Sequence, residues 1–334
     1  MTTLLESRYR TVLRLLPAYY RREREEEMVE TYLGDLDRDT QDQSRPTLGE
    51  MASIAALAVR CRLGAPGAPR GYALLGSSVR VFVLWAVLLQ AASAVVTPVL
   101  QLTWSFTRGS AERQMFLVEF TDHGPLAAAV AAAQWILPLG WAAAYFALLY
   151  DRRRLARICA AVAALPTLWP LLGSVLGVAF LSMPAFTFTY LLFTWLPVLA
   201  LCAAHHRDAP PARLPVGSPG LVLMATCVMM GASQVVLPAA AADLAWAPAN
   251  CFVVGALGWL LWRARRTEPG GPGVALALAA LGLLLLAVRV TALYPWLGLD
   301  LPAVYVGGGL GQTAALTLLT AVLAVVGSRE LARR

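Results

Sequence analysis

Eight apolar segments of about 17 to 25 residues follow one another along this 334-residue chain. An apolar helix of about 20 residues, rising 1.5 Å per residue, spans the hydrocarbon core of a bilayer, which is roughly 30 Å thick. We therefore expect an all-α fold, a polytopic bundle of about eight transmembrane helices near residues 81–103, 125–149, 158–181, 184–204, 219–239, 246–262, 273–292 and 303–326. The boundary at Met183 is ambiguous, which leaves a seven-span count open.

The composition favours a membrane protein over a soluble one. The chain is 58% hydrophobic and 14% charged, whereas soluble domains average about 45 to 50% apolar and about 25% charged residues. All 27 basic residues are arginine, a bias typical of GC-rich genomes that predicts a bacterial, actinobacterial source.

Arginine placement predicts the orientation. The segments after the second, fourth, sixth and eighth spans read DRRRLAR, HHRDAPPAR, RARRTEPGGPG and SRELARR and hold twelve arginines, whereas the alternate loops hold only Arg108 and Arg113. Loops rich in arginine stay in the cytoplasm, and the opening MTTLLESRYR has no secretory signal pattern. We expect a multi-pass protein of the cell membrane with both termini cytoplasmic.

Residues 1–70 differ from the transmembrane part, residues 71–334, and predict a small cytosolic domain of three helices. Thr3 with Glu6 and Thr47 with Glu50 have capping-box spacing, and Pro17 interrupts the first helix. Eleven arginines balance eleven acids in this segment, so the excess positive charge that nucleic-acid binding requires is missing. The partners expected are the lipid bilayer and a cytosolic or membrane protein that binds residues 1–70.

The charged run RREREEE marks the second helix of this prefix. Arg21 with Glu25 and Arg22 with Glu26 lie four residues apart, so each pair is expected to meet along the helix surface, stabilising it by only tenths of a kcal/mol. The run is either a solvated helix face or a surface that docks a partner, and these four residues are the candidates for docking.

Polar residues inside apolar spans are the natural place to search for a transport pathway. Gln90, Gln134, Gln234, Asn250, Gln312 and Arg289 are the candidates. The amides can bond to one another between helices, which is a structural role. Arg289 near the end of its span is expected to extend to the membrane surface or to pair with Asp300.

No motif predicts catalysis, a cofactor or a metal site. HExxH, GxSxG and the Walker loop are absent, and the five cysteines have no CxxC spacing. His205 and His206 are interpreted as residues of the membrane boundary, with a proton or metal role as the alternative. Residues 104–124 form the one sizeable outer loop, in which SAERQMFLVEF is expected either to lie along the membrane or to pack as a loop helix.

The stretches LLPAYYRREREEEM and RPTLGE carry a resemblance to a known class of membrane proteins. Residues 5–64 are similar to the permease-prefix and HAAS-like helical domains that precede the spans of many actinobacterial multi-pass proteins. The resemblance implies a role in signalling or transport and carries no catalytic residues. Such permeases usually continue into a large extracytoplasmic domain, and here the outer loop has only about twenty residues.

Three functions agree with these features. The first is a non-enzymatic signalling or transport-accessory protein whose prefix docks a partner. The second is a transporter or permease for a small or lipophilic substrate. The third is a membrane-bound regulator of a sigma factor, although the zinc anti-sigma pattern HxxxCxxC is absent.

Overall fold

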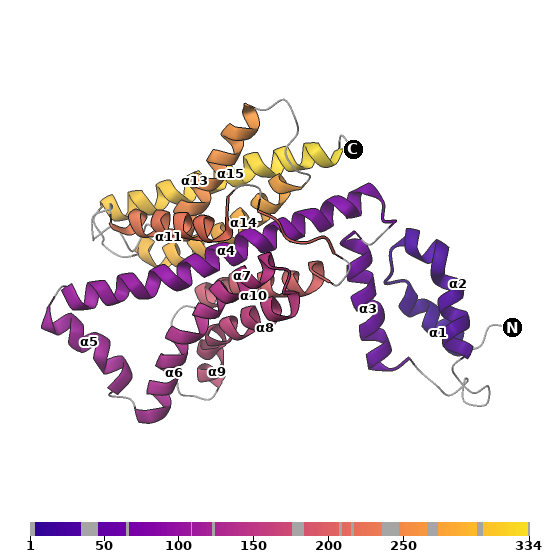
Figure 1. The fold of residues 1–334 in the computed structure, drawn as a ribbon, viewed down its shortest axis with the longest axis horizontal. Helices are drawn as coiled ribbons and strands as arrows, with labels where there is room; N and C mark the ends of the chain where they lie inside the picture. Colours follow the sequence, from indigo (N-terminus) through magenta and orange to yellow (C-terminus); the bar gives the residue numbers. More distant parts are fainter. Residues whose placement is uncertain are drawn as a thin grey trace.

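The computed structural model describes residues 4–34, 46–64, 67–107, 109–121, 124–175, 184–206, 209–214, 217–235, 247–265, 273–298 and 303–332. These residues form helices and their connections, without a strand in this part of the chain, so the all-α prediction is confirmed. Figure 1 shows a group of three short helices beside a larger bundle.

The small group consists of α1 (Leu4–Leu13), α2 (Ala18–Gly34) and α3 (Leu48–Arg62). The predicted capping box begins α3: the Glu50 amide donates to Thr47 Oγ1 at 3.2 Å, and the Thr47 amide donates to Glu50 Oε2 at 2.7 Å. Two donors that the helix itself leaves without partners are thereby satisfied. Thr3, the cap predicted for the first helix, lies outside the described residues.

The three helices share a hydrophobic core of their own. Leu13 of α1, Val29 of α2 and Ile54 of α3 are all buried in it. The rings of Tyr9 and Tyr32 stack with their centroids 4.0 Å apart. This apolar contact explains why α2 keeps its position although nearly half of its residues are charged.

The remaining helices are α4 (Arg70–Thr107), α5 (Ser110–Thr121), α6 (Gly124–Ile136), η2 (Leu137–Leu139), α7 (Gly140–Leu149), α8 (Arg153–Ala164), η3 (Leu165–Leu168), α9 (Trp169–Val175), α10 (Pro184–Ala204), α11 (Pro219–Val235), α13 (Ala247–Ala264), α14 (Val274–Leu293), η4 (Tyr294–Gly298) and α15 (Ala303–Ala332).

The number of spans differs from the prediction. Within the described ranges, six helical segments are long and apolar enough to cross a membrane, not eight: Arg70–Thr107, Gly124–Leu149, Arg153–Val175, Pro184–Ala204, Val274–Gly298 and Val306–Ala332. The segment expected at 219–239 contains α11, whose apolar part within the described residues, Pro219–Ser233, is shorter than a span, and residues 236–239 lie outside the described residues. The segment expected at 246–262 is α13, where Pro248, Asn250 and Arg263 lower the hydropathy.

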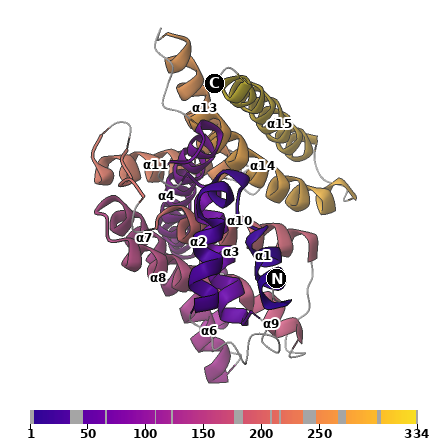
Figure 2. The ribbon, with the colours of Figure 1, turned by 90° about the vertical axis from the view of Figure 1, so that its right-hand side faces the viewer.

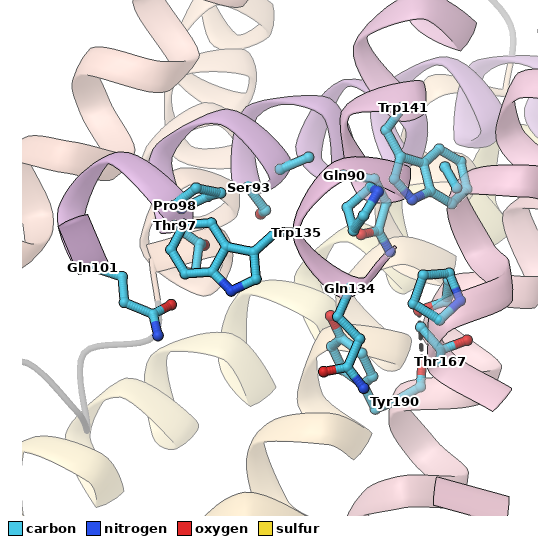
Figure 3. A pocket seen from close by; sticks show the side chains of 15 residues that line it. Gln90, Ser93, Thr97, Pro98, Gln101, Gln134, Trp135, Trp141, Thr167 and Tyr190 are labelled. Atoms are coloured by element: carbon cyan, nitrogen blue, oxygen red, sulfur yellow. Dashed lines mark hydrogen bonds between the residues drawn. The ribbon is translucent and has the colours of Figure 1, made fainter. Parts of the chain in front are cut away.

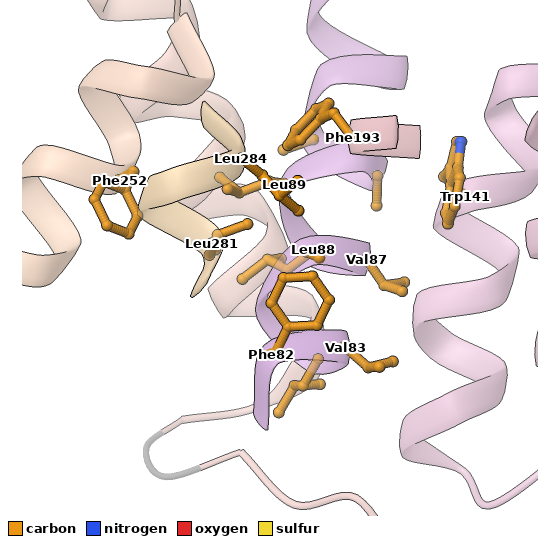
Figure 4. Close-up of a cluster of buried hydrophobic side chains, with 14 of the residues drawn as sticks. Phe82, Val83, Val87, Leu88, Leu89, Trp141, Phe193, Phe252, Leu281 and Leu284 are labelled. Atoms are coloured by element: carbon orange, nitrogen blue, oxygen red, sulfur yellow. The ribbon is translucent and has the colours of Figure 1, made fainter. Parts of the chain in front are cut away.

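Helix α4 is the centre of the bundle. In Figure 1 it runs diagonally across the molecule, with α13 to α15 on one side and α6 to α10 on the other. Val83 and Val87 point toward Trp141 of α7, whereas Leu88 and Leu89 point toward α14 on the opposite side (Figure 4). Both faces of α4 are therefore covered, as is typical of a helix that is hydrophobic on all sides.

The loop expected on the outer side contains a packed helix, α5, which agrees with the second of the two expectations for it. Helix α5 contacts α4 and α6. Phe116 lies 5.2 Å from Trp135 of α6 between ring centroids, and the Arg113 guanidinium lies 5.1 Å from the ring centre of Phe106 of α4. These aromatic contacts fix α5 to the ends of its two neighbours.

The small helical group adjoins the beginning of α4, as seen from its side in Figure 2. The Tyr19 hydroxyl of α2 donates to the Cys61 carbonyl of α3 at 2.9 Å, and its ring lies 5.6 Å from that of Tyr72 in α4. Gly76 of α4 faces the Leu63 carbonyl so closely that a Cβ there would overlap it. This point, the Leu63–Gly76 contact, joins the prefix to the bundle without an intervening side chain.

Candidate functional site

Two of the predicted intramembrane amides meet at one cavity. Gln90 of α4 and Gln134 of α6 both line a cavity of about 300 Å³ between α4, α6, α7, η3 and α10. Figure 3 shows both amides beside Thr167 and Tyr190. The other polar residues that line it are Ser93, Thr97, Gln101 and Thr194.

The cavity offers hydrogen bonds but no charge from the described residues that line it. Gln90 is buried, and its amide nitrogen donates to the Phe193 carbonyl at 3.4 Å. Thr167 accepts a hydrogen bond from the Trp195 indole at 3.1 Å. Amide and hydroxyl groups of this kind suit water or a small neutral polar solute, because no charged side chain among the described lining residues offsets the charge of an ion.

Two other predicted amides meet at a second place. Gln312 of α15 donates to the Asn250 side-chain oxygen of α13 at 2.7 Å. This bond agrees with the structural role expected for the amides, since it ties two neighbouring helices together. The side chain of Gln234 lies outside the described part of the chain.

Arg289 does not extend to a surface, so that expectation is wrong. Its side chain is buried in the bundle, with a residue exposure of 3%. Nε and one Nη have no hydrogen-bond partner among the residues that the structure describes. Asp300, the predicted partner, is outside those residues. The arginine lies on α14, which packs against α4, α10 and α15.

The charged candidates of α2 pair across helices instead of along one. Arg10 of α1 donates to both carboxylate oxygens of Glu26, at 2.9 and 2.8 Å, and lies 3.6 Å from Glu25. The expected pairs with Arg21 and Arg22 are replaced because α1 brings a competing guanidinium to the same carboxylates. The bond from Arg10 holds the pKa of Glu26 below its ordinary value. Arg21 is half-buried, and Arg22 remains exposed.

The structure gathers arginines at the end of the bundle near the prefix, which sequence reasoning used only for orientation. Arg60 of α3 and the arginines from Arg152 to Arg157 line one open pocket of about 690 Å³ with His206. We name this the arginine pocket. The DRRRLAR pattern indicated the charge, but nothing in the sequence indicated that Arg60 would join it from more than ninety positions away.

His205 lies behind the arginine pocket and is buried, with an exposure of 1%. Burial is the main cause that lowers its pKa to about 4, and the positive charges of Arg80, Arg153 and Arg157 act in the same direction. Neither ring nitrogen has a partner among the described residues. His205 is therefore a neutral buried residue at pH 7, and it directly follows the candidate span Pro184–Ala204, so its position at the membrane boundary stays a prediction.

Comparison with protein-family models, with curated proteins and with solved structures finds no match. The resemblance to prefix domains and the actinobacterial source therefore stay predictions.

Proposed function

We propose that this chain is a non-enzymatic multi-pass protein of the cell membrane whose prefix, residues 1–70, docks a protein partner in the cytosol. Signalling or assistance to a transporter is the process that such docking serves. The Leu63–Gly76 contact is the observation that carries the proposal. A backbone contact of this kind transmits a displacement of α3 to α4, because no flexible side chain lies between the two helices.

The outer face of α2 is the proposed docking surface. Arg22, Glu26 and Glu30 follow one another at intervals of four residues and are exposed. Glu26 is held by Arg10, which leaves Arg22 and Glu30 as the residues of this row with exposed charge and no ion pair within the described ranges. Alternating charge on a helix face favours a partner with the complementary pattern.

A pull-down after cross-linking in native membranes tests the docking surface in the full-length protein. The double variant Arg22→Glu with Glu30→Arg reverses the row and leaves the net charge unchanged. We expect it to lower recovery of the partner by roughly tenfold, the scale of a lost charge pair at an interface. The matched control is Arg24→Glu with Glu27→Arg, which exchanges an existing ion pair of the same helix and should retain the partner.

The identity of the recovered partner shows which process the docking serves. A transport ATPase would assign the chain to transport, and a sigma factor would assign it to transcriptional control. Undiminished recovery with the double variant, at equal abundance in the membrane, would remove α2 as the docking surface.

The second candidate function is a transporter for a small neutral polar solute. The cavity that Gln90 and Gln134 share favours it. Complementation of a deletion strain distinguishes the two proposals. Rescue by the α2 double variant together with failure of a Gln90→Leu, Gln134→Leu variant at equal abundance would favour transport over docking.

A further inference from the structure

We propose that the arginine pocket binds the phosphate headgroup of an anionic membrane phospholipid. Five arginines line it against a single acid, Asp151. That acid is engaged, because its Oδ1 accepts a hydrogen bond from Arg153 Nε at 2.7 Å. The pocket therefore presents a strong positive charge to whatever enters it.

Two of the arginines hold the pocket together. Arg153 donates to the carbonyls of His206 and Ala209, and Arg157 donates to the carbonyl of His205. These bonds fix the chain that leaves α10 against the beginning of α8. The wall of the pocket is thus built from residues whose own hydrogen bonds are largely internal.

The other three arginines are available to a ligand. Arg60, Arg152 and Arg154 are exposed, and none of them has an ion pair with a residue that the structure describes. They come from two separate parts of the chain, since Arg60 lies in α3, and Arg152 and Arg154 lie at the beginning of α8. The tendency of arginine to remain in cytoplasmic loops explains their number, but it does not explain their convergence around one hollow.

The beginning of α8 adds a second group of donors. Arg152 is the residue that precedes the helix, and no side chain caps the free amides of its first turn. Such amides, together with the helix dipole, favour a phosphate at a helix N-terminus. Guanidinium groups bind phosphate oxygens through paired N–H donors. Both kinds of donor point to a phosphate group.

The surroundings favour a lipid over a free phosphate as the source of that group. Leu155 also lines the pocket, and with Ile158 and Val162 it forms an exposed apolar row along α8 at helical spacing. These side chains are 50%, 61% and 39% exposed. A row of this kind suits the acyl chains of a lipid whose headgroup occupies the pocket, since basic pockets next to membrane helices bind anionic headgroups.

Binding of a lipid with a fluorescent acyl chain to the purified full-length protein tests the proposal. We expect phosphatidylglycerol to bind more tightly than phosphatidylcholine, and millimolar inorganic phosphate not to displace it. Each arginine near an anionic lipid contributes roughly a five-fold gain in affinity. The triple variant Arg60→Gln, Arg152→Gln, Arg154→Gln should therefore bind phosphatidylglycerol about 100-fold more weakly.

The control variant is Arg14→Gln, Arg62→Gln, Arg70→Gln, which removes the same charge from exposed positions outside the pocket. It should bind nearly as the natural protein does. The single changes Arg60→Gln and Arg62→Gln give the same comparison within α3 if the triple variant does not fold. Equal losses in variant and control, equal binding of phosphatidylcholine, or displacement by inorganic phosphate would each overturn the assignment.

Discussion

Gly76 illustrates how one residue determines the junction of two helical groups. A side chain at this position would meet the Leu63 carbonyl, which is backbone and cannot rotate away. We expect Gly76→Ala to destabilise the protein by about 1 to 3 kcal/mol, the usual cost of overpacking. The change in melting temperature of the purified protein measures this effect.

Gly71 provides the control, because a Cβ there has no neighbour within contact distance and the residue lies in the same helix. Gly71→Ala should be neutral or stabilise α4 by up to about 1 kcal/mol, as alanine favours a helix over glycine. Equal effects of the two substitutions would contradict the close contact at Gly76.

His205 predicts how stability depends on pH. Its pKa in the folded protein is lowered to about 4, whereas an unfolded histidine has a pKa of about 6.5. Between these values the unfolded chain binds a proton that the folded protein excludes, so stability falls as the pH is lowered from about 6.5 to 4. The loss is on the order of 3 kcal/mol.

Melting temperatures at pH 7 and pH 4.5 measure this loss. Other groups, including Glu26, also change near the lower pH, so the comparison with His205→Gln isolates the histidine. The variant should lose less stability over this range than the natural protein. The same loss in both proteins would show that His205 is not the responsible group.

At the scale of elements, the capping box of α3 was predictable because it depends on two residues three positions apart. Thr47→Ala should destabilise α3 by about 1 kcal/mol. Hydrogen exchange of the amides of residues 48–62 measures this, and faster exchange is expected from the first turn. Thr47→Ser keeps the hydroxyl and should keep the slow exchange; acceleration by serine as well would point to lost packing instead of a lost cap.

Other elements depend on contacts that no local pattern contains. Glu25 and Glu26 have arginines four positions earlier, yet they pair with Arg10, because the turn at Pro17 folds α1 back onto α2. Helices α11 and α13 were expected to be spans from their apolar residues alone. Within the described residues, the apolar part of α11 is shorter than a span, and polar residues lower the hydropathy of α13.

At the scale of the whole molecule, the orientation can be tested directly. We expect both ends of the chain in the cytoplasm, because the six candidate spans within the described ranges are an even number and the arginines favour the inner side. A fluorescent protein fused to either end should fold in the cytosol. A reporter that functions only outside the cell membrane should be active near Arg113, in α5, and its activity at the C-terminus would contradict this topology.

The sequence predicted the helical fold and several individual residues of the candidate site. It did not predict how the helices pack against one another. The length of the apolar segments indicated a helical membrane protein. The polar residues singled out within these segments included Gln90 and Gln134, which line one cavity. The meeting of Arg60 with Arg154 depends on how the prefix packs against the bundle. Periodicity in one segment carries no information about such packing.

The continuity of α4 has a consequence for insertions and deletions. One helix carries Gly76 against the prefix and Val87 within the core of the bundle. Each residue of a helix turns the chain by about 100°. A single residue inserted between these positions would rotate the prefix by that angle about the axis of α4 and carry Gly76 away from Leu63. The number of residues between them is therefore as constrained as their identity, and a change of about seven residues, two full turns, is the smallest that nearly restores the angle.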